Sequence, residues 1–218
     1  ARSDFQQSLR WEHRPGALVA LARAHLAEGA LDEADRLLTE ALEADERYGP
    51  THETLGHLMM AWDEPKSAAR AYEQSLGLGH ATPDLYRGVW QAYLRLENMD
   101  RAHELIVEGA GRFPESDALQ AAVGDSLVYA KGESESAPDW WARALAINAN
   151  NFEANFGMAG HHAARGERDP ALDYLKRCVA LNRDRAVKLW KDDLTSPLRK
   201  FGDFAADPDF RRLLGGLD

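Results

Sequence analysis

Residues 31–42 read LDEADRLLTEAL, and a variant of this phrase returns four more times along the chain. In each copy, an alanine is followed four residues later by a large apolar residue. The alanines are Ala34, Ala68, Ala102, Ala137 and Ala171, and the large residues are Leu38, Tyr72, Ile106, Trp141 and Leu175. Successive alanines are separated by 34, 34, 35 and 34 residues. A period of this length is typical of proteins built from stacked repeats.

Each repeat has the pattern of two amphipathic helices joined by a short turn, because apolar residues recur every three or four positions on both sides of a break. The nine prolines lie between these periodic stretches or in their first turns, where a missing amide proton costs no helical hydrogen bond. Asp169-Pro170, Ser196-Pro197 and Asp207-Pro208 each place a capping side chain before a proline at the first helical position. The pattern therefore predicts an all-α protein.

Composition agrees with helices and argues against several classes of function. Alanine occurs 36 times, whereas isoleucine, valine and threonine together occur 14 times, which favours helix over sheet. The net charge of −10 gives no attraction to nucleic acid or anionic lipid, and no apolar run is long enough to span a membrane. The single cysteine, Cys178, excludes an internal disulfide and a cysteine-based metal cluster.

The chain resembles the tetratricopeptide repeat (TPR) family in three features. These are the 34-residue period, a small residue at the eighth place of most repeats, and alanine at the twentieth place. The small residues are Ala22, Gly56, Gly124 and Ala159. The resemblance implies a right-handed α-solenoid of helix-turn-helix units, with five units in residues 15–184. Trp90 departs from the pattern, because an indole at the eighth place of the third unit requires the helices to shift. The fourth unit has one extra residue, which we assign to the turn KGESES at residues 131–136.

Both ends of the array have sequences that predict capping elements. Residues 1–14 carry Phe5, Leu9 and Trp11, either in a cap or in half of a repeat that belongs to a longer array. Residues 185–218 predict capping helices that cover the last repeat. The apolar residues available for this are Phe201, Phe204, Phe210, Leu213 and Leu214.

In the TPR family, the first helix of each unit lines a concave face, and the resemblance assigns specific places to that face. The partner-binding candidates are Arg23, His57, Arg87, Gln91, Arg95, Asp125, Tyr129 and Phe156, with Trp190 from the closing helix and with Glu53, Val128 and Glu153 at further groove places. Aromatic anchors with a few charges suit an extended or helical peptide, and the arginines favour a carboxylate on the partner. Two alternatives stay open: arginine is common on solvated helix faces, and Trp190 can instead pack on the last unit.

Specialised TPR functions and enzymatic chemistry find no support in the sequence. The clamp for chaperone-tail carboxylates and the asparagine ladder both require asparagine at places that hold other residues here. Motifs for phosphate, metal or a catalytic nucleophile do not occur, and no cofactor is implied. Adjacent His161 and His162 face directions about 100° apart on a helix, which favours a packed, hydrogen-bonded His162 over a metal ligand. Cys178 is expected to be buried and inert.

These observations predict a non-enzymatic adaptor that binds a segment of a protein partner, without nucleic-acid binding or membrane insertion. Two other functions remain open: a TPR module of a larger enzyme whose catalytic domain lies outside this sequence, and a scaffold that assembles with copies of itself through its ends. The lone cysteine and the acidic charge favour a cytoplasmic location, with periplasmic and membrane-associated forms left open.

Overall fold

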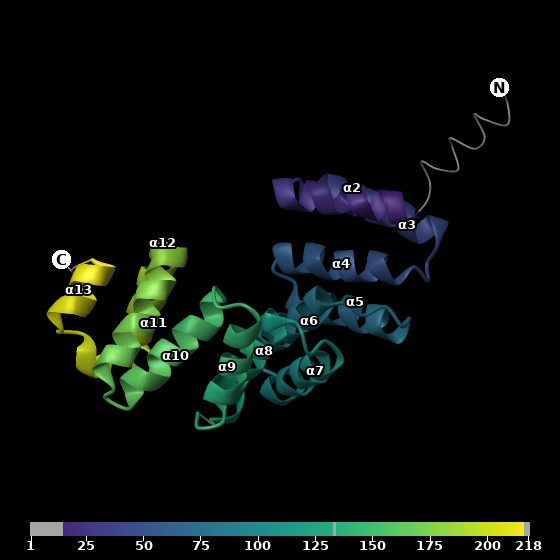
Figure 1. Cartoon of the computed structure of the whole chain (residues 1–218). Helices are drawn as coiled ribbons and strands as arrows, with labels where there is room; N and C mark the ends of the chain where they lie inside the picture. Colours follow the sequence, from purple (N-terminus) through teal and green to yellow (C-terminus); the bar gives the residue numbers. More distant parts are fainter. Residues whose placement is uncertain (1–14, 133, 216–218) are drawn as a thin grey trace, which may run out of the picture. The chain divides into compact units, whose positions relative to one another are not determined.

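The computed structural model describes residues 15–132 and 134–215, and these residues form twelve α-helices and no β-strand (Figure 1). The helices are α2 (Pro15–Glu28), α3 (Leu31–Ala44), α4 (Gly49–Ala61), α5 (Pro65–Gly77), α6 (Pro83–Arg95), α7 (Met99–Arg112), α8 (Asp117–Ser126), α9 (Ala137–Ile147), α10 (Phe152–Ala164), α11 (Arg168–Leu181), α12 (Arg183–Thr195) and α13 (Pro208–Leu214). The predicted all-α fold is confirmed. The predicted N-terminal helix at residues 1–14 lies outside the described residues.

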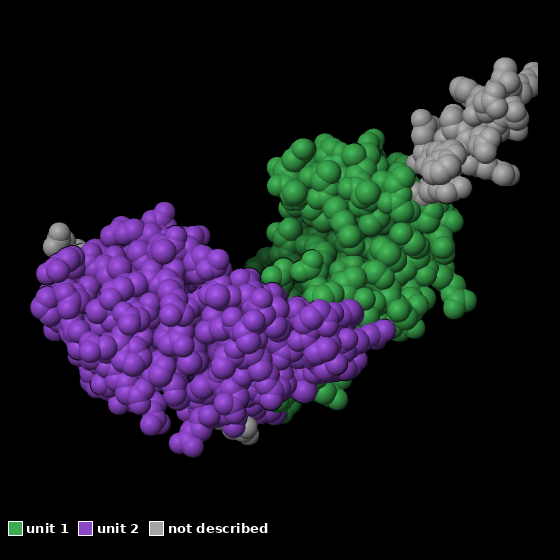
Figure 2. Space-filling model, viewed as in Figure 1, with its two compact units in different colours: residues 1–105 green, residues 106–218 purple. Residues whose placement is uncertain are grey.

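The chain divides into two compact units, residues 1–105 and residues 106–218 (Figure 2). In unit 1, α2 packs on α3 and α4 packs on α5. In unit 2, α8 packs on α9 and α10 packs on α11, while α12 and α13 pack on α11. The division falls inside α7, where the repeat pattern indicates no boundary.

A residue in the left-handed conformation ends the first helix of each of the five helical pairs. These residues are Gly29, Asp63, Glu97, Gly132 and Gly166, with φ between 57° and 77°. Counted from the start of α2, α4, α6 and α10, this residue is the fifteenth of its repeat, but Gly132 is the sixteenth counted from the start of α8. The extra residue of the fourth repeat therefore precedes Gly132.

A π-helical turn, η1 (Leu127–Lys131), continues α8 and accommodates the extra residue. A single inserted residue in a helix is commonly absorbed as a π-bulge, because the wider turn lets the helices on either side keep their register. The assignment of the insertion to the KGESES turn was wrong. The insertion lies within the helix, and it changes the direction in which the last turn presents its side chains.

Two second helices each contribute an aromatic ring that is held between glycines of first helices. The sets are Tyr72 with Gly56 and Gly88, and Trp141 with Gly124 and Gly157. A Cβ on Gly88 would lie 2.6 Å from Tyr72 Cζ, and a Cβ on Gly124 would lie 2.5 Å from Trp141 Nε1. Glycine is therefore required at these positions to make room for the rings. Both rings are fully or almost fully buried.

Trp90 occupies a small-residue place in the third repeat, and the structure accommodates it half-buried. Its indole nitrogen is buried and has no hydrogen-bond partner among the described residues. Leaving a buried donor unpaired costs about 1–3 kcal/mol. The local cost of a large residue at this place is thus an unsatisfied donor on α6.

C-terminal residues pack on the last helical pair. Phe201, Phe210 and Leu214 belong to the same buried cluster as residues of α10, α11 and α12. Cys178 is fully buried in this cluster, as expected, and burial raises the pKa of its thiol to about 12.

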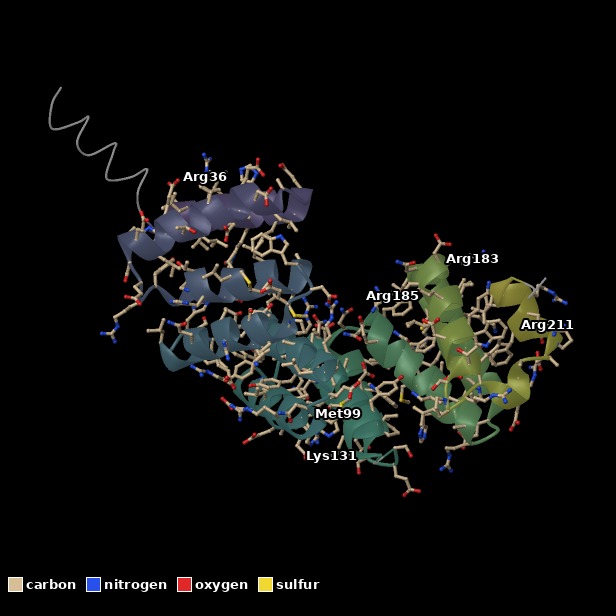
Figure 3. All side chains as sticks on the ribbon, turned by 180° about the vertical axis from the view of Figure 1, so that it is seen from behind. Arg36, Met99, Lys131, Arg183, Arg185 and Arg211 are labelled. Atoms are coloured by element: carbon tan, nitrogen blue, oxygen red, sulfur yellow. The ribbon has the colours of Figure 1, made fainter. Side chains whose placement is uncertain are left out.

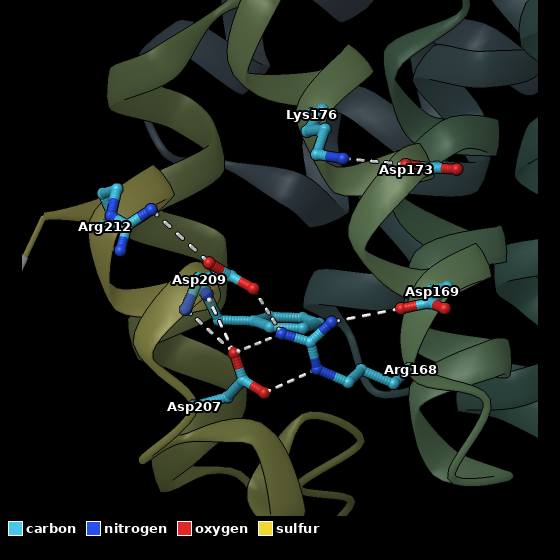
Figure 4. Close-up of polar contacts among 8 residues, drawn as sticks. Arg168, Asp169, Asp173, Lys176, Asp207, Asp209 and Arg212 are labelled. Carbon is cyan, nitrogen blue, oxygen red and sulfur yellow. Dashed lines mark hydrogen bonds and ion pairs between the residues drawn. The ribbon is translucent and has the colours of Figure 1, made fainter.

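An arginine network fastens α13 to the start of α11 (Figure 4). Arg168 Nε donates to Asp207 Oδ2 at 2.7 Å, and Arg168 Nη2 donates to Asp207 Oδ1 at 3.0 Å and to Asp209 Oδ2 at 2.5 Å. Asp207 also caps α13, because its side chain accepts from the backbone N–H groups of the first turn. One aspartate therefore both starts α13 and joins it to α11.

Candidate functional site

In unit 1, the predicted groove residue Glu53 is buried and lies at the centre of a cluster of polar side chains, of which Arg23 and His80 are partly exposed. Glu53 Oε2 accepts from Arg23 Nη2 at 2.9 Å and lies 2.8 Å from His80 Nε2, while Thr82 Oγ1 donates to Glu53 Oε1 at 2.5 Å. Burial raises the pKa of Glu53, but the hydrogen bonds from Thr82 and His80 and the charge of Arg23 outweigh it and hold this pKa below its ordinary value. Glu53 and Arg23 thus form an ion pair within unit 1.

His57 on α4 is half-buried and meets the polar end of the ring of Tyr72. His57 Nδ1 lies 2.9 Å from Tyr72 Oη, and the two rings meet edge to face. Burial lowers the pKa of His57 and raises that of Tyr72. Both groups are therefore neutral near pH 7, and each is the hydrogen-bond partner of the other.

The three arginines predicted to contact a partner each have a carboxylate of this chain as an ion-pair partner. The pairs are Arg23 with Glu53, Arg87 with Asp84 and Arg95 with Asp63. Gln91, between the last two arginines on α6, is exposed. Because the positive charges are balanced within the chain, these arginines give little reason to expect an acidic partner.

Unit 2 contains a groove that brings three predicted residues together. We call it the α8–α12 groove: a cavity of about 210 Å³ between α8, η1, α10, α12 and the segment after α12. Its lining residues are Asp125, Tyr129, Phe152, Glu153, Phe156, Gly157, Arg185, Leu189 and Lys200. Asp125, Tyr129 and Phe156 are the predicted partner-binding residues among them.

Aromatic rings form one part of the α8–α12 groove. Phe152 and Phe156, one turn apart on α10, stack with ring centroids 6.3 Å apart. Tyr129 projects from the π-helical turn and is 57% exposed, the largest fraction among the exposed large apolar residues described. An exposed ring beside a cavity is a typical anchor for a partner side chain.

The acidic residues of the groove have different environments. Asp125 on α8 accepts a hydrogen bond from Trp141 Nε1 at 3.1 Å and has no ion pair among the described residues. Burial raises the pKa of Asp125 to about 7, although the Trp141 hydrogen bond and the charge of Lys200 oppose this increase. Glu153 on α10, in contrast, pairs with Arg185 Nη2 at 2.6 Å.

Two basic side chains lie at the edges of the groove. Arg185, in the first turn of α12 (Figure 3), also places its guanidinium 4.4 Å from the centre of the Phe152 ring. Lys200 Nζ lies 4.8 Å from the centre of the Tyr129 ring and donates to Tyr129 Oη at 3.3 Å. Both contacts are cation–π interactions.

Sequence reasoning missed Arg185, Leu189 and Lys200, and it misplaced Trp190. Trp190 is fully buried in the cluster with Phe201 and Phe210, so the alternative of packing on the last unit is the one observed, and we remove Trp190 from the candidate site. The cause is a change of register, because α12 begins 31 residues after α10 instead of 34. Counting by 34 therefore selected the wrong face of α12.

The histidine doublet of α10 has a structural role. His162 Nδ1 lies 2.6 Å from Glu167 Oε2, and its ring stacks on Tyr174 with centroids 5.6 Å apart. This confirms the prediction of a packed, hydrogen-bonded histidine. The described residues contain no group of three or more histidine, cysteine or acidic side chains arranged to hold a metal ion.

Comparison with known proteins adds to the repeat pattern and the helical pairs. A family model of the tetratricopeptide repeat matches residues 17–50. The match covers one repeat, and the chain has the fold of TPR proteins. A comparison with curated protein sequences finds no significant match.

Several solved structures resemble the chain over most of its length. PilF of Pseudomonas aeruginosa matches with a TM-score of 0.71 and 19% identity, over 93% of this chain and 92% of that one. YrrB, described as a TPR protein with an unusual peptide-binding site, matches with a TM-score of 0.63 and 17% identity, over 86% of this chain and 97% of that one. MamA matches with a TM-score of 0.62 and 18% identity, over 76% of this chain and 96% of that one. At these identities the likeness shows the fold alone.

TPR proteins are typically non-catalytic modules that bind protein or peptide partners, and the fold of this chain is that of a protein-interaction scaffold. None of the described helices is long and apolar enough to cross a lipid bilayer.

Proposed function

We propose that this protein is a non-enzymatic scaffold that binds a short segment of a partner protein in the α8–α12 groove of unit 2. The observation that carries the proposal is the exposed ring of Tyr129 beside a cavity that also contains Phe156, Asp125 and Lys200. A cavity of about 210 Å³ is smaller than most drug-binding sites and matches one or two side chains of a peptide. The rest of such a segment would extend along the open groove.

The predicted residues of unit 1 support a binding site less well. Arg23, Arg87 and Arg95 are each paired with a carboxylate of the chain, and His57 is satisfied by Tyr72. In the described part of unit 2, by contrast, apolar rings, a carboxyl without an ion pair and a lysine without a carboxylate partner share one cavity. Binding energy at interfaces concentrates in such aromatic anchors.

The experiment that tests this proposal selects ligands from a random dodecapeptide library displayed on phage, with the whole chain as bait. We expect enriched peptides to bind the wild type and to lose at least tenfold in affinity for the double variant Tyr129→Ala/Phe156→Ala. That loss corresponds to about 1.4 kcal/mol or more, which is typical of a removed aromatic anchor. Fluorescence anisotropy of labelled peptides measures the affinities.

The matched control is Ile147→Ala/Leu181→Ala, which removes two exposed apolar side chains of unit 2 that lie outside the α8–α12 groove. Its affinities should equal those of the wild type, and circular dichroism should show equal helicity for all three proteins. If both double variants bind the selected peptides as tightly as the wild type does, the groove is not the binding site.

A further inference from the structure

Lys200 lies at the edge of the α8–α12 groove, the proposed site for a partner, and its side chain is one of those that line the cavity. It lies over the Tyr129 ring and donates a 3.3 Å hydrogen bond to the phenol oxygen. It lines both the α8–α12 groove and a second cavity of about 280 Å³ that also contains Trp141 and His161. Lys200 is thus the residue that the linings of these two cavities of unit 2 have in common.

The surroundings of the Lys200 ammonium have the chemistry of a cation-binding site. An aromatic face, that of Tyr129, and a half-buried carboxyl, that of Asp125, line the groove, and the carboxyl has no ion pair among the described residues. Glu153 adds a second carboxylate, which is paired with Arg185 from the edge. An aromatic face and carboxyl groups within one cavity are the groups that recognise ammonium and guanidinium ions.

The contacts of Lys200 are weak and easily exchanged. Among the described residues, no carboxylate lies within ion-pair distance of its ammonium, and its one hydrogen bond is long. The backbone beside it is fixed independently, because Phe201 is fully buried and its N–H donates to Asp193 Oδ2 at 3.0 Å. The Lys200 side chain can therefore leave the groove without moving this backbone, although its stem then gives up its packing against Gly160 of α10.

We propose that the α8–α12 groove recognises a basic side chain, lysine or arginine, of the partner segment, and that Lys200 is an internal competitor which occupies the same position in the free protein. This inference rests on the proposed function of the groove. It reverses the sequence-based expectation of an acidic partner, which depended on arginines that the chain itself neutralises. The net charge of −10 also favours the approach of a basic segment.

The protonation of Asp125 couples this recognition to pH. The groups that face Asp125 are Trp141 from α9, Glu153 from α10, Arg185 from α12 and Lys200 from the segment after α12, and Tyr129 from η1 shares its cavity. Because burial raises its pKa to about 7, Asp125 carries a full negative charge only above neutral pH. A basic ligand should accordingly bind more tightly at pH 8 than at pH 6.

The test repeats the dodecapeptide phage selection at pH 8 with two baits, the wild type and Lys200→Ala. We expect Lys200→Ala to enrich peptides with lysine or arginine next to an aliphatic or aromatic residue. These peptides should bind Lys200→Ala at least fivefold more tightly than the wild type, because the competing ammonium is gone. The gain should disappear in Lys200→Ala/Asp125→Asn, in which the amide oxygen still accepts from Trp141 but the negative charge is absent.

Lys188→Ala is the matched control, because Lys188 lies on α12 with a 77% exposed side chain and outside the groove. It should change no affinity. Enrichment of acidic peptides that bind Lys200→Ala more weakly than the wild type would overturn the inference, since Lys200 would then be an anchor for a carboxylate. If those peptides also lost affinity for Tyr129→Ala/Phe156→Ala, the proposed function of the groove would still be supported. Peptides that are insensitive to the Tyr129 and Phe156 substitutions, or no enrichment on either bait, would overturn the proposed function together with the inference.

Discussion

At the scale of single residues, a ring from a second helix and a polar residue from a first helix form a repeated pair. Tyr72 reaches between two glycines to meet His57, and Trp141 reaches between two glycines to meet Asp125. Both polar residues are the ninth of their repeats. The two pairs differ in chemistry, because a neutral histidine accepts burial readily whereas a carboxylate does not. Asp125 is therefore the residue whose charge state depends on solution pH.

The raised pKa of Asp125 predicts a pH dependence of stability. In the folded protein Asp125 keeps its proton up to about pH 7, whereas an unfolded aspartic acid loses its proton near pH 3.9. Between these values the folded state binds more protons, so the contribution of Asp125 makes folding less favourable as pH rises, and the full penalty is present above pH 7. Asp125→Asn removes this penalty.

We expect the free energy of unfolding of Asp125→Asn, relative to the wild type, to increase by on the order of 1–3 kcal/mol between pH 4 and pH 7.5. Urea denaturation of both proteins at pH 4, 6 and 7.5 measures this difference. Parallel pH profiles for the two proteins would mean that the Asp125 carboxyl titrates as it does in water.

At the scale of helices, the fourth repeat differs from the others in its π-helical turn, which carries Tyr129. The other first helices end one residue earlier in their repeats, at Gly29, Asp63, Glu97 and Gly166. One additional residue rotates the remainder of an α-helix by about 100° unless a wider turn absorbs it. The turn Leu127–Lys131 is therefore the feature that separates this repeat from the others.

Deletion of Ala130 should test the importance of the π-helical turn. Without the extra residue the fourth repeat has the 34-residue length of its neighbours, so the turn can become α-helical and the hairpin should still fold. The contact between Tyr129 and Lys200 should be lost, and affinity for groove-selected peptides should fall at least tenfold with little change in helicity. Unchanged affinity in the deletion variant would show that the turn does not position the binding site.

The fold was predictable from sequence because it depends on local periodicity, which the repeated alanine and aromatic places reveal directly. The candidate site was predictable only in part. Asp125, Tyr129 and Phe156 occupy regular places in the repeat, but Arg185 and Lys200 belong to elements that leave the 34-residue register. Trp190 was misassigned for the same reason, and the partners of Arg23 and Arg95 come from residues about thirty positions away. Such contacts depend on packing between repeats, which periodicity does not describe.

At the scale of the whole molecule, the end of a repeat array needs a cover, because the last repeat has no neighbour on one side. Here Phe201, Phe210 and Leu214 supply apolar cover for α11 and α12, and the Arg168 network ties α13 in place. The same C-terminal segment carries Lys200 into the groove. The apolar residues that cover the last repeat and the proposed competitor Lys200 therefore belong to one segment. A substitution that weakens the packing of this segment should also affect the position of Lys200.

Arg168→Ala should show whether the Arg168 network stabilises the C-terminal segment more than an exposed ion pair does. Arg168 makes a two-point hydrogen-bonded contact with Asp207 that also involves the cap of α13, so its removal should lower the Tm by a few degrees. Lys176→Ala is the control from the same helix, because Lys176 pairs with Asp173 on an exposed surface (Figure 4), where single ion pairs contribute little. If the C-terminal segment holds Lys200 in the groove, Arg168→Ala should also raise affinity for basic peptides, whereas Lys176→Ala should not. Equal melting temperatures for the two variants in calorimetry would show that the Arg168 network does not secure the cover.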